Sequence, residues 1–376
     1  MLPVRRNDGE ITMSDFIQLH MLVSYPPSNL NRDDLGRPKT AVMGGTQRLR
    51  ISSQSLKRAW RTSDVFSANL AGSLGVRTKD MGSAILKSLQ SGIRLSTVIK
   101  GDLQEKASFK PVDGKKALSL ARQIAEVFGK LKKGDDSVEI EQLAHFNPEE
   151  ISAIEKLIEK IAASGKDPDD NDKKILMKSR TAVDIAMFGR MLASSPEFNT
   201  EAAVQVAHAV TVHEVAVEDD YFTAVDDLNR GEEDAGAGHL GETEFASGLF
   251  YTYICIDKTL LEKNLGENKD LVKTAIKALV EAATKVAPTG KQNSFASRAY
   301  ASYLLVEKGS KQPRSLSVAY LGAIRDSMDL LGSAIRALED TRKKIDSVYG
   351  KCWADELIMD AHAGTGSLDT ILEKIC

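Results

Sequence analysis

An alternating apolar stretch near the start of the chain, residues 15–25 (DFIQLHMLVSY), constrains the fold more than any other feature. Its side chains divide between the two sides of an extended chain, with Ile17, Leu19, Met21 and Val23 on one side and Phe16, Gln18, His20 and Leu22 on the other. A period of two residues is typical of a β-strand, and the Pro26–Pro27 pair that follows predicts its end. We therefore expect the fold to contain a sheet.

The other expected elements follow in a definite order. They are a helix capped by Ser52 or Ser53 and running to about residue 70, a helical stretch from about 71 to 190, strands at 202–217 and 248–257, a helix at about 267–287, a strand at 299–307 and a long helix from about 315 to 347. Without the helical stretch, the order is strand–helix–strand–strand–helix–strand, which is that of RRM or ferredoxin-like folds.

The predicted fold class is therefore α+β, an RRM or ferredoxin-like fold with a discontinuous main domain. Residues 14–70 and 191–376 are expected to form this domain, and residues 71–190 a large helical insertion. Residues 216–248 are expected to form an extended excursion from it. This excursion is acidic, because ten Asp or Glu lie between positions 216 and 245 against one basic residue, Arg230.

Charge is distributed unevenly along a chain whose formal net charge is -3. Residues 37–61 contain no Asp or Glu but seven basic residues, namely Arg37, Lys39, Arg48, Arg50, Lys57, Arg58 and Arg61. A helix that begins at Ser53 divides its side chains between two faces, with Gln54, Lys57, Arg58 and Arg61 on one and Leu56, Ala59 and Trp60 on the other. This helix is thus expected to be cationic on one side and apolar on the other.

Two interpretations of this basic stretch are open. An ordinary solvated helix face usually interleaves Glu with Lys at i, i+4, whereas the first acid here is Asp64. A polyanion would remove the repulsion between the like charges, and the helix N-terminus and the Gly44–Gly45 loop offer backbone N–H groups to phosphate. Because Lys39, Arg48 and Arg50 add further cations, the pattern favours the backbone of a nucleic acid.

Other classes of protein are disfavoured by the sequence. It contains no run of about 18 apolar residues and no signal-peptide core, so we expect a cytoplasmic protein without a membrane span. The three cysteines lack disulfide or zinc-site spacing: Cys255, Cys352 and Cys376. His208 and His213 would face opposite sides of a strand, and His20 is interpreted as a structural histidine in preference to an RNA contact. No Walker loop, HExxH or nucleophile motif occurs, so we expect no cofactor, no metal and no catalytic residue.

Six stretches of the sequence resemble one known family. They are FIQLHMLVSYPPSNLNRDD (16–34), MGGTQRLRISSQSLKRAWR (43–61), AVDIAMFGRMLAS (182–194), AHAVTVHEV (207–215), DDYFTAVDDL (219–228) and GAGHLGETEFASGLFYTY (236–253). In this order they are similar to the CasC family, the crRNA-binding backbone subunit of the type I-E CRISPR Cascade complex. The resemblance runs from about residue 14 to about residue 295, and residues 71–175 match only in outline.

The resemblance implies a shape like a right hand, with an RRM-like palm, helical fingers at 71–190 and a thumb at 216–248. It implies that several copies stack along the spacer of a crRNA, grip its phosphates and present its bases for pairing with target DNA in antiviral defence. The implied partners are crRNA, target DNA through the guide, further copies of the chain, and the large, small, guide-cap and crRNA-processing subunits of Cascade. The implied role is binding without catalysis.

The resemblance also assigns RNA contacts to particular residues. The family positions are Arg32, Lys39, Gln54, Lys57, Arg58 and Arg61, and the basic stretch adds Arg48 and Arg50. Met191 matches an apolar side chain that lies against a displaced guide base, and Phe222 with Thr223 matches a thumb tip that wedges into the heteroduplex. From the residues alone, Met191 is also consistent with a core methionine, and Phe222 with packing on its own loop. Phosphate contacts and apolar wedges suit a subunit that accepts any spacer, because they carry no sequence information.

The acidic excursion leaves open an alternative of a different class. Its charge repels a phosphate backbone, so apolar contact and shape must attract RNA to it, or its acids meet the basic stretch of a neighbouring copy. Asp226 and Asp227 are also carboxylates of the kind that hold Mg²⁺, and related backbone subunits of type III complexes cut RNA with a thumb aspartate. The alternative is therefore a metal-dependent endoribonuclease with the same fold.

Overall fold

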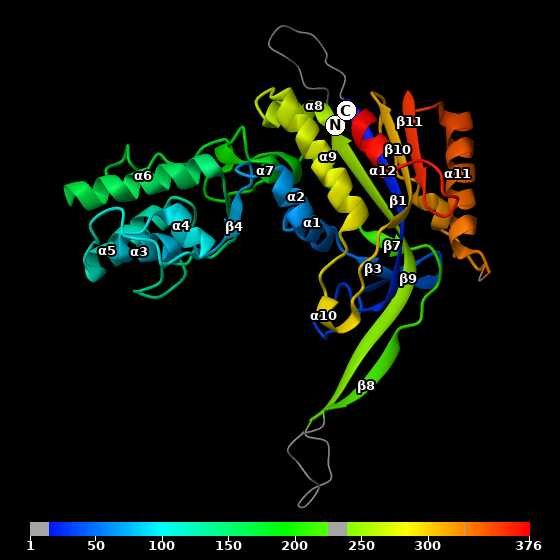
Figure 1. Ribbon diagram of the computed structural model, residues 1–376, viewed down its shortest axis with the longest axis horizontal. Helices are drawn as coiled ribbons and strands as arrows, with labels where there is room; N and C mark the ends of the chain where they lie inside the picture. The colour runs from blue at the N-terminus through cyan, green and yellow to red at the C-terminus, as the bar shows by residue number, and fades with distance from the viewer. Residues whose placement is uncertain (1–14, 225–238, 327) are drawn as a thin grey trace, which may run out of the picture. The chain divides into compact units, whose positions relative to one another are not determined.

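The chain folds into two units, which the computed structural model describes for residues 15–224, 239–326 and 328–376 (Figure 1). The first unit is made of three segments, Met1–Asn69, Val204–Thr259 and Lys273–Cys376, and the second of Leu70–Ala203 and Leu260–Val272. In the described residues, no helix is both long and apolar enough to cross a bilayer. The combination of helices with an antiparallel sheet confirms the predicted α+β class.

The sheet of the first unit is antiparallel at every described pairing. Its strand order is β11–β10–β1–β9–β7–β3–β2, and β6 and β8 also pair with β9. The strands are β1 (Phe16–Ser28), β2 (Thr40–Met43), β3 (Thr46–Ile51), β6 (Val204–Val206), β7 (Ala209–Thr211), β8 (Glu218–Ala224), β9 (His239–Asp257), β10 (Ala301–Gly309) and β11 (Asp355–Asp360).

Strand β1 lies in the interior of this sheet, between β9 and β10. The predicted strand is confirmed, and all the residues from Phe16 to Val23 are buried, whichever face of the sheet they lie on. Both faces are covered because the strands run between α9 (Lys269–Lys285) on one side and α11 (Leu330–Tyr349) on the other (Figure 1). On the α11 face, Leu22 and Tyr303 belong to one apolar cluster with Leu338.

The remaining helices of the chain outside its central part are short. They are α1 (Ser53–Arg61), α2 (Asp64–Asn69), α8 (Lys258–Asn264), α10 (Gln292–Phe295) and α12 (Leu368–Lys374), with a 3₁₀ turn η2 (Ser317–Tyr320). The predicted start of α1 is confirmed, since Ser52 is its N-cap. Between β2 and β3, Gly44 and Gly45 have φ of 60° and 79°, and a side chain at Gly44 would collide with the carbonyl oxygen of Leu321. Glycine is therefore required at this turn.

Four predicted features differ from those observed. Strand β1 does not end at Pro26–Pro27 but runs through both prolines to Ser28, with a break in its register with β9 between Tyr25 and Ser28. The single helix expected to run to about residue 70 is divided, because α1 ends at Arg61 and α2 begins at Asp64.

The strand expected at 202–217 is interrupted, because four steps from Val206 to Val210 lie opposite three steps from Ile254 to Tyr251 on β9. The extra residue makes a β-bulge. The helix expected from 315 begins at Leu330, because residues before it cross the sheet with Leu316 buried and Asp329 caps the helix by accepting from the Gly332 N–H.

The second unit is mainly helical. It contains α3 (Met81–Ser91), α4 (Leu95–Lys100), α5 (Gly114–Glu126), α6 (Pro148–Ser164), α7 (Val183–Phe188), a 3₁₀ turn η1 (Pro196–Phe198) and the paired strands β4 (Val76–Thr78) and β5 (Ala144–Phe146). The helical stretch predicted in this region is confirmed, and the apolar sides of α5 and α6 share one core. Asn147 and Glu150 form a capping box at the start of α6, and buried Arg190 pairs with Glu150 at 2.8 Å.

Candidate nucleic-acid interface

Helix α1 has the two-sided character that its sequence predicts. Leu56, Ala59 and Trp60 are buried, while Gln54 and Arg58 are exposed. Its first turn contains no acid, and Arg58 and Arg61 lie in the last turn. There the carbonyl end of the helix dipole favours cations, so the dipole accounts for part of the basic pattern.

Lys57 is half-buried within α1, before the last turn of the helix. Burial lowers the pKa of its ammonium group from the ordinary value, which means that the surroundings disfavour the charged form. An anion placed against Lys57 would reverse that effect. A phosphate group at this surface would therefore stabilise the charged form of Lys57 more than it would stabilise the charged form of a fully solvated lysine.

Backbone hydrogen bonds join the other basic residues to the start of α1. The Ser52 N–H donates to Asn31 Oδ1 and the Lys39 N–H to the Asn31 carbonyl, both at 2.8 Å. The Arg50 N–H in turn donates to the Lys39 carbonyl at 2.8 Å, and Arg32 is bridged to Pro38. These contacts hold Arg32, Lys39 and Arg50 beside the helix in one region of the first unit, which we call the β3–α1 surface.

The β3–α1 surface is short of negative charge. Arg37 Nε lies 3.0 Å from Glu244 Oε1 on β9. For Lys39, Arg50 and Arg58, by contrast, no carboxylate of the described residues lies within ion-pairing distance. Three cations on connected backbone without a carboxylate are suited to an anionic ligand.

Arg48 does not belong to this surface, contrary to the prediction that it is one of the RNA-binding cations. Its side chain is fully buried, and its guanidinium donates to Thr46 Oγ1 at 2.8 Å and to the carbonyls of Thr211 at 2.9 Å and Tyr320 at 3.3 Å. Burial disfavours the charged form and lowers its pKa, which Glu214 partly offsets. Because its donors are bound inside the protein, Arg48 stabilises the packing of η2 on the sheet.

His208 joins the β3–α1 surface, although its sequence context did not suggest it. It lies in the bulge between β6 and β7, where bulges often redirect a side chain, and its Nδ1 is 2.8 Å from Arg50 Nη1. His213 instead has Nδ1 at 2.7 Å from the Glu214 carbonyl and accepts from the Leu249 N–H. Within the described residues, no group of three or more His, Cys, Asp or Glu could hold a metal; Asp226 and Asp227 lie outside those residues.

The two predicted apolar contacts have different surroundings. Met191 belongs to the second unit and is 78% exposed, so its alternative interpretation as a core methionine is wrong. It borders a cavity of about 300 Å³ that is also lined by Phe128 and Leu143. Phe222 on β8 is 43% exposed and packs partly on its own hairpin, because a side chain at Gly241 would meet its ring. The adjacent Thr223 is exposed.

His20 is confirmed as a structural histidine, because it is completely buried. Its Nδ1 lies 2.8 Å from Tyr251 Oη and its Nε2 lies 3.3 Å from Glu307 Oε2. Arg314 and Arg342 also bind the Glu307 carboxylate, Arg342 Nε at 2.7 Å. We call these groups the Glu307 network.

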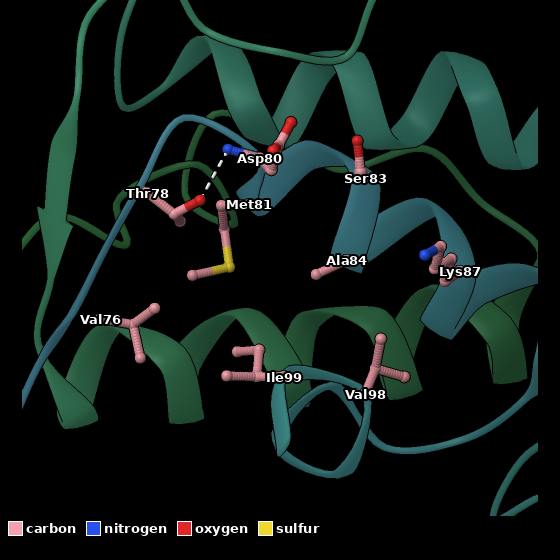
Figure 2. Close-up of a pocket in the computed structure, with 9 residues that line it drawn as sticks. All are labelled: Val76, Thr78, Asp80, Met81, Ser83, Ala84, Lys87, Val98 and Ile99. Carbon is pink, nitrogen blue, oxygen red and sulfur yellow. Dashed lines mark hydrogen bonds between the residues drawn. The ribbon is translucent and has the colours of Figure 1, made fainter. Parts of the chain in front are cut away.

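A separate pocket of about 500 Å³ lies beside α3 in the second unit (Figure 2). Its lining includes apolar Met81 and Ile99 together with Asp80 and Lys87 (Figure 2). Thr78 Oγ1 accepts from the Asp80 N–H at 2.9 Å. Because one carboxylate accompanies one ammonium group in this lining, the pocket lacks the excess of cations that marks the β3–α1 surface.

Comparisons with a family model and with solved structures point to the same kind of protein. Residues 17–373 match the model of the family described as CT1975-like protein. A chain of a solved "CRISPR RNA-guided surveillance complex, pre-nicking" is similar with a TM-score of 0.79 and 30% identity, over 95% of this chain and 99% of that one. A chain of a "CRISPR RNA-guided surveillance complex" has a TM-score of 0.57 and 24% identity, over 96% of this chain and 100% of that one, and shows the fold alone. No curated protein matches. The family model spans nearly the whole chain, and the chain therefore belongs to the CT1975-like family of Cas proteins.

Proposed function

We propose that this chain is the crRNA-binding backbone subunit of a type I-E Cascade surveillance complex. Several copies stack along the guide spacer, grip its phosphates and present its bases to target DNA. The first unit serves as an RRM-like palm, the second as fingers, and the β8–β9 hairpin as the base of a thumb. The other partners are the large, small, guide-cap and crRNA-processing subunits, and the complex works in the cytoplasm.

The observation that carries this proposal is the β3–α1 surface. Lys39, Arg50 and Arg58 lie on connected backbone without a carboxylate at ion-pairing distance in the described part of the chain. Cations that contact phosphates bind RNA of any sequence, as a guide-holding subunit requires. The similarity to a surveillance-complex chain over 95% of this chain supports the same role.

The two apolar side chains extend the proposal beyond phosphate contacts. Met191 is exposed beside a cavity, and Phe222 is partly exposed near the end of β8, which pairs with β9. Exposed large apolar groups of this kind can contact bases without reading their hydrogen-bonding edges. We assign Met191 to a displaced guide base, and Phe222 with Thr223 to the wedge at the thumb.

RNA affinity measured against salt concentration tests the β3–α1 surface. With Lys57→Ala and Arg58→Ala combined, affinity should fall equally for two unrelated spacers, and the slope of log K against log salt should flatten by about 1.4, roughly 0.7 for each lost contact with single-stranded RNA. Lys343→Ala with Lys344→Ala, on exposed α11 positions, is the matched control. An unchanged affinity and slope in the α1 variant would mean that α1 is a solvated face, and the proposal would fail.

We further propose that the subunit binds RNA without cutting it. The rival assignment depends on Asp226 and Asp227 holding Mg²⁺, and an incubation of the assembled complex with labelled RNA and Mg²⁺ distinguishes the two. We expect intact RNA. Regularly spaced products that disappear in Asp226→Asn with Asp227→Asn, while RNA binding survives, would establish the endoribonuclease instead.

A further inference from the structure

A pocket of about 230 Å³ opens in the first unit beside the bulge that holds His208. It is lined by His208, Met43, Tyr251, Tyr320 and Ser317, among others. Its volume is below the roughly 300–1,000 Å³ of pockets that hold drug-sized ligands. The pocket therefore fits one small group, such as a single planar ring system.

The walls of this pocket are held in place before any ligand binds. Tyr251 and Tyr320 have ring centroids 5.2 Å apart. The Tyr320 hydroxyl donates to the Ala334 carbonyl at 3.0 Å, and the Tyr251 hydroxyl accepts from the Leu316 N–H at 3.0 Å. Because both hydroxyls are bonded to backbone, neither ring needs to be ordered when a ligand enters, which lowers the entropic cost of binding.

His208 supplies a neutral hydrogen-bond donor at this pocket. A guanidinium has only donors, so the contact with Arg50 requires that His208 Nδ1 accept and that the proton be on Nε2. Burial, followed by the charges of Arg50 and Lys39, lowers the pKa of His208 and keeps the ring neutral at pH 7. Among the described residues Nε2 has no partner, so it is available to a carbonyl or ring nitrogen of a ligand.

The cations beside the pocket narrow the class of ligand. Arg50 bonds His208 directly, and Lys39 is adjacent to Arg50 through a backbone hydrogen bond. A protein side chain entering the pocket would leave both cations without an anion. A nucleotide would place its base against the apolar walls and its phosphate against the cations, and stacking of this kind accepts any base.

We propose that this pocket receives one base of the bound guide RNA, with the adjoining phosphate held by Arg50 and Lys39. The inference rests on the proposed function, since the RNA must first lie along the β3–α1 surface. It assigns His208 Nε2 as the donor to the base and Ser317 as the lining residue whose enlargement closes the pocket.

Photocrosslinking tests this assignment in the assembled complex. A crRNA carrying 4-thiouridine at one spacer position at a time is irradiated, and crosslinked peptides are identified by mass spectrometry. We expect crosslinks to peptides containing Tyr251 or residues 315–320 at a subset of positions. Ser317→Phe should reduce them about tenfold, in proportion to the loss of a base contact, while total RNA affinity changes by less than about threefold. Ser347→Phe, exposed on α11, is the control.

Variants of His208 provide a second measurement. His208→Ala should reduce the same crosslinks, and His208→Gln should restore them, because its amide accepts from Arg50 and donates with its nitrogen. Bound RNA without pocket crosslinks, or crosslinks that Ser317→Phe leaves unchanged, would overturn the base pocket alone. A complex that binds no RNA would refute the proposed function as well.

Discussion

Two groups of cations in the first unit have opposite surroundings. In the Glu307 network, the cations Arg314 and Arg342, together with the imidazole of His20, surround a buried carboxylate. On the β3–α1 surface, Lys39, Arg50 and Arg58 have no carboxylate at ion-pairing distance within the described residues. The first group is complete without a ligand, whereas the second is not. Cations with a structural role are thus distinguished from cations with a binding role by their counter-charge.

The largest expected effect is on the complete group. Glu307→Gln would leave Arg314 and Arg342 without their buried counter-charge, so the free energy of unfolding should fall by about 3–5 kcal/mol. Urea denaturation measures it. Glu356→Gln, which removes a 39% exposed carboxylate from Arg342, is the control and should cost about 1 kcal/mol or less. Equal small losses in both variants would mean that the network adds little to stability.

The same network should also determine how the free energy of unfolding depends on pH. Burial alone would raise the pKa of Glu307, but hydrogen bonds from His20 and Arg314 outweigh it and hold the pKa at about 2, below its ordinary 4.5. The unfolded chain therefore takes up the proton first. The contribution of Glu307 is complete above pH 4.5 and is lost as the pH falls towards 2, on the order of 3 kcal/mol.

His20 acts in the same direction at higher pH. Burial lowers its pKa below the ordinary 6.5, so protonation of the unfolded chain below pH 6.5 also reduces stability. Urea midpoints measured from pH 7 to pH 3 should therefore decrease throughout. In Glu307→Gln, the decrease below pH 4.5 should be smaller than in the wild type. Parallel curves for the two proteins would contradict the assignment of the acid limb to Glu307.

The smallest effect on stability is expected at the incomplete group. Lys39→Ala with Arg58→Ala removes partly or fully exposed cations that repel one another, so the free energy of unfolding should change by no more than about 0.5 kcal/mol. RNA affinity, measured on the same preparation, should fall. A loss of more than about 2 kcal/mol of stability would place these side chains with the structural cations and remove the contrast.

The sequence predicted the parts of the fold that depend on local pattern. Strand β1, the N-cap of α1 at Ser52 and the helical character of α6 each follow from neighbouring residues. The start of α11 was placed too early, because residues 315–320 contain helix-compatible side chains that pack on the sheet instead. Local pattern cannot distinguish those two uses of apolar residues.

The candidate site was predicted less completely, because contacts with residues far away in the sequence decide which of its side chains are exposed and which are buried. Arg48 and Arg50 lie two positions apart on β3, yet Arg48 is buried by acceptors at Thr211 and Tyr320, 163 and 272 residues away in the sequence. His208 reaches Arg50 through a bulge that depends on the register with β9. Neither contact leaves a signal in the residues around it.

The position of β1 also has a consequence during synthesis of the chain on the ribosome. Its partners β9 and β10 end at Asp257 and Gly309, so β1 waits for about 280 further residues, on the order of 15–60 s at bacterial and eukaryotic elongation rates. Until then, the apolar side chains between Phe16 and Val23 lack the packing partners that bury them in the folded protein. The second unit, drawn mostly from Leu70–Ala203, can form its core earlier. Nascent chains stalled before residue 300 should therefore engage chaperones through β1, although their central helices are already folded.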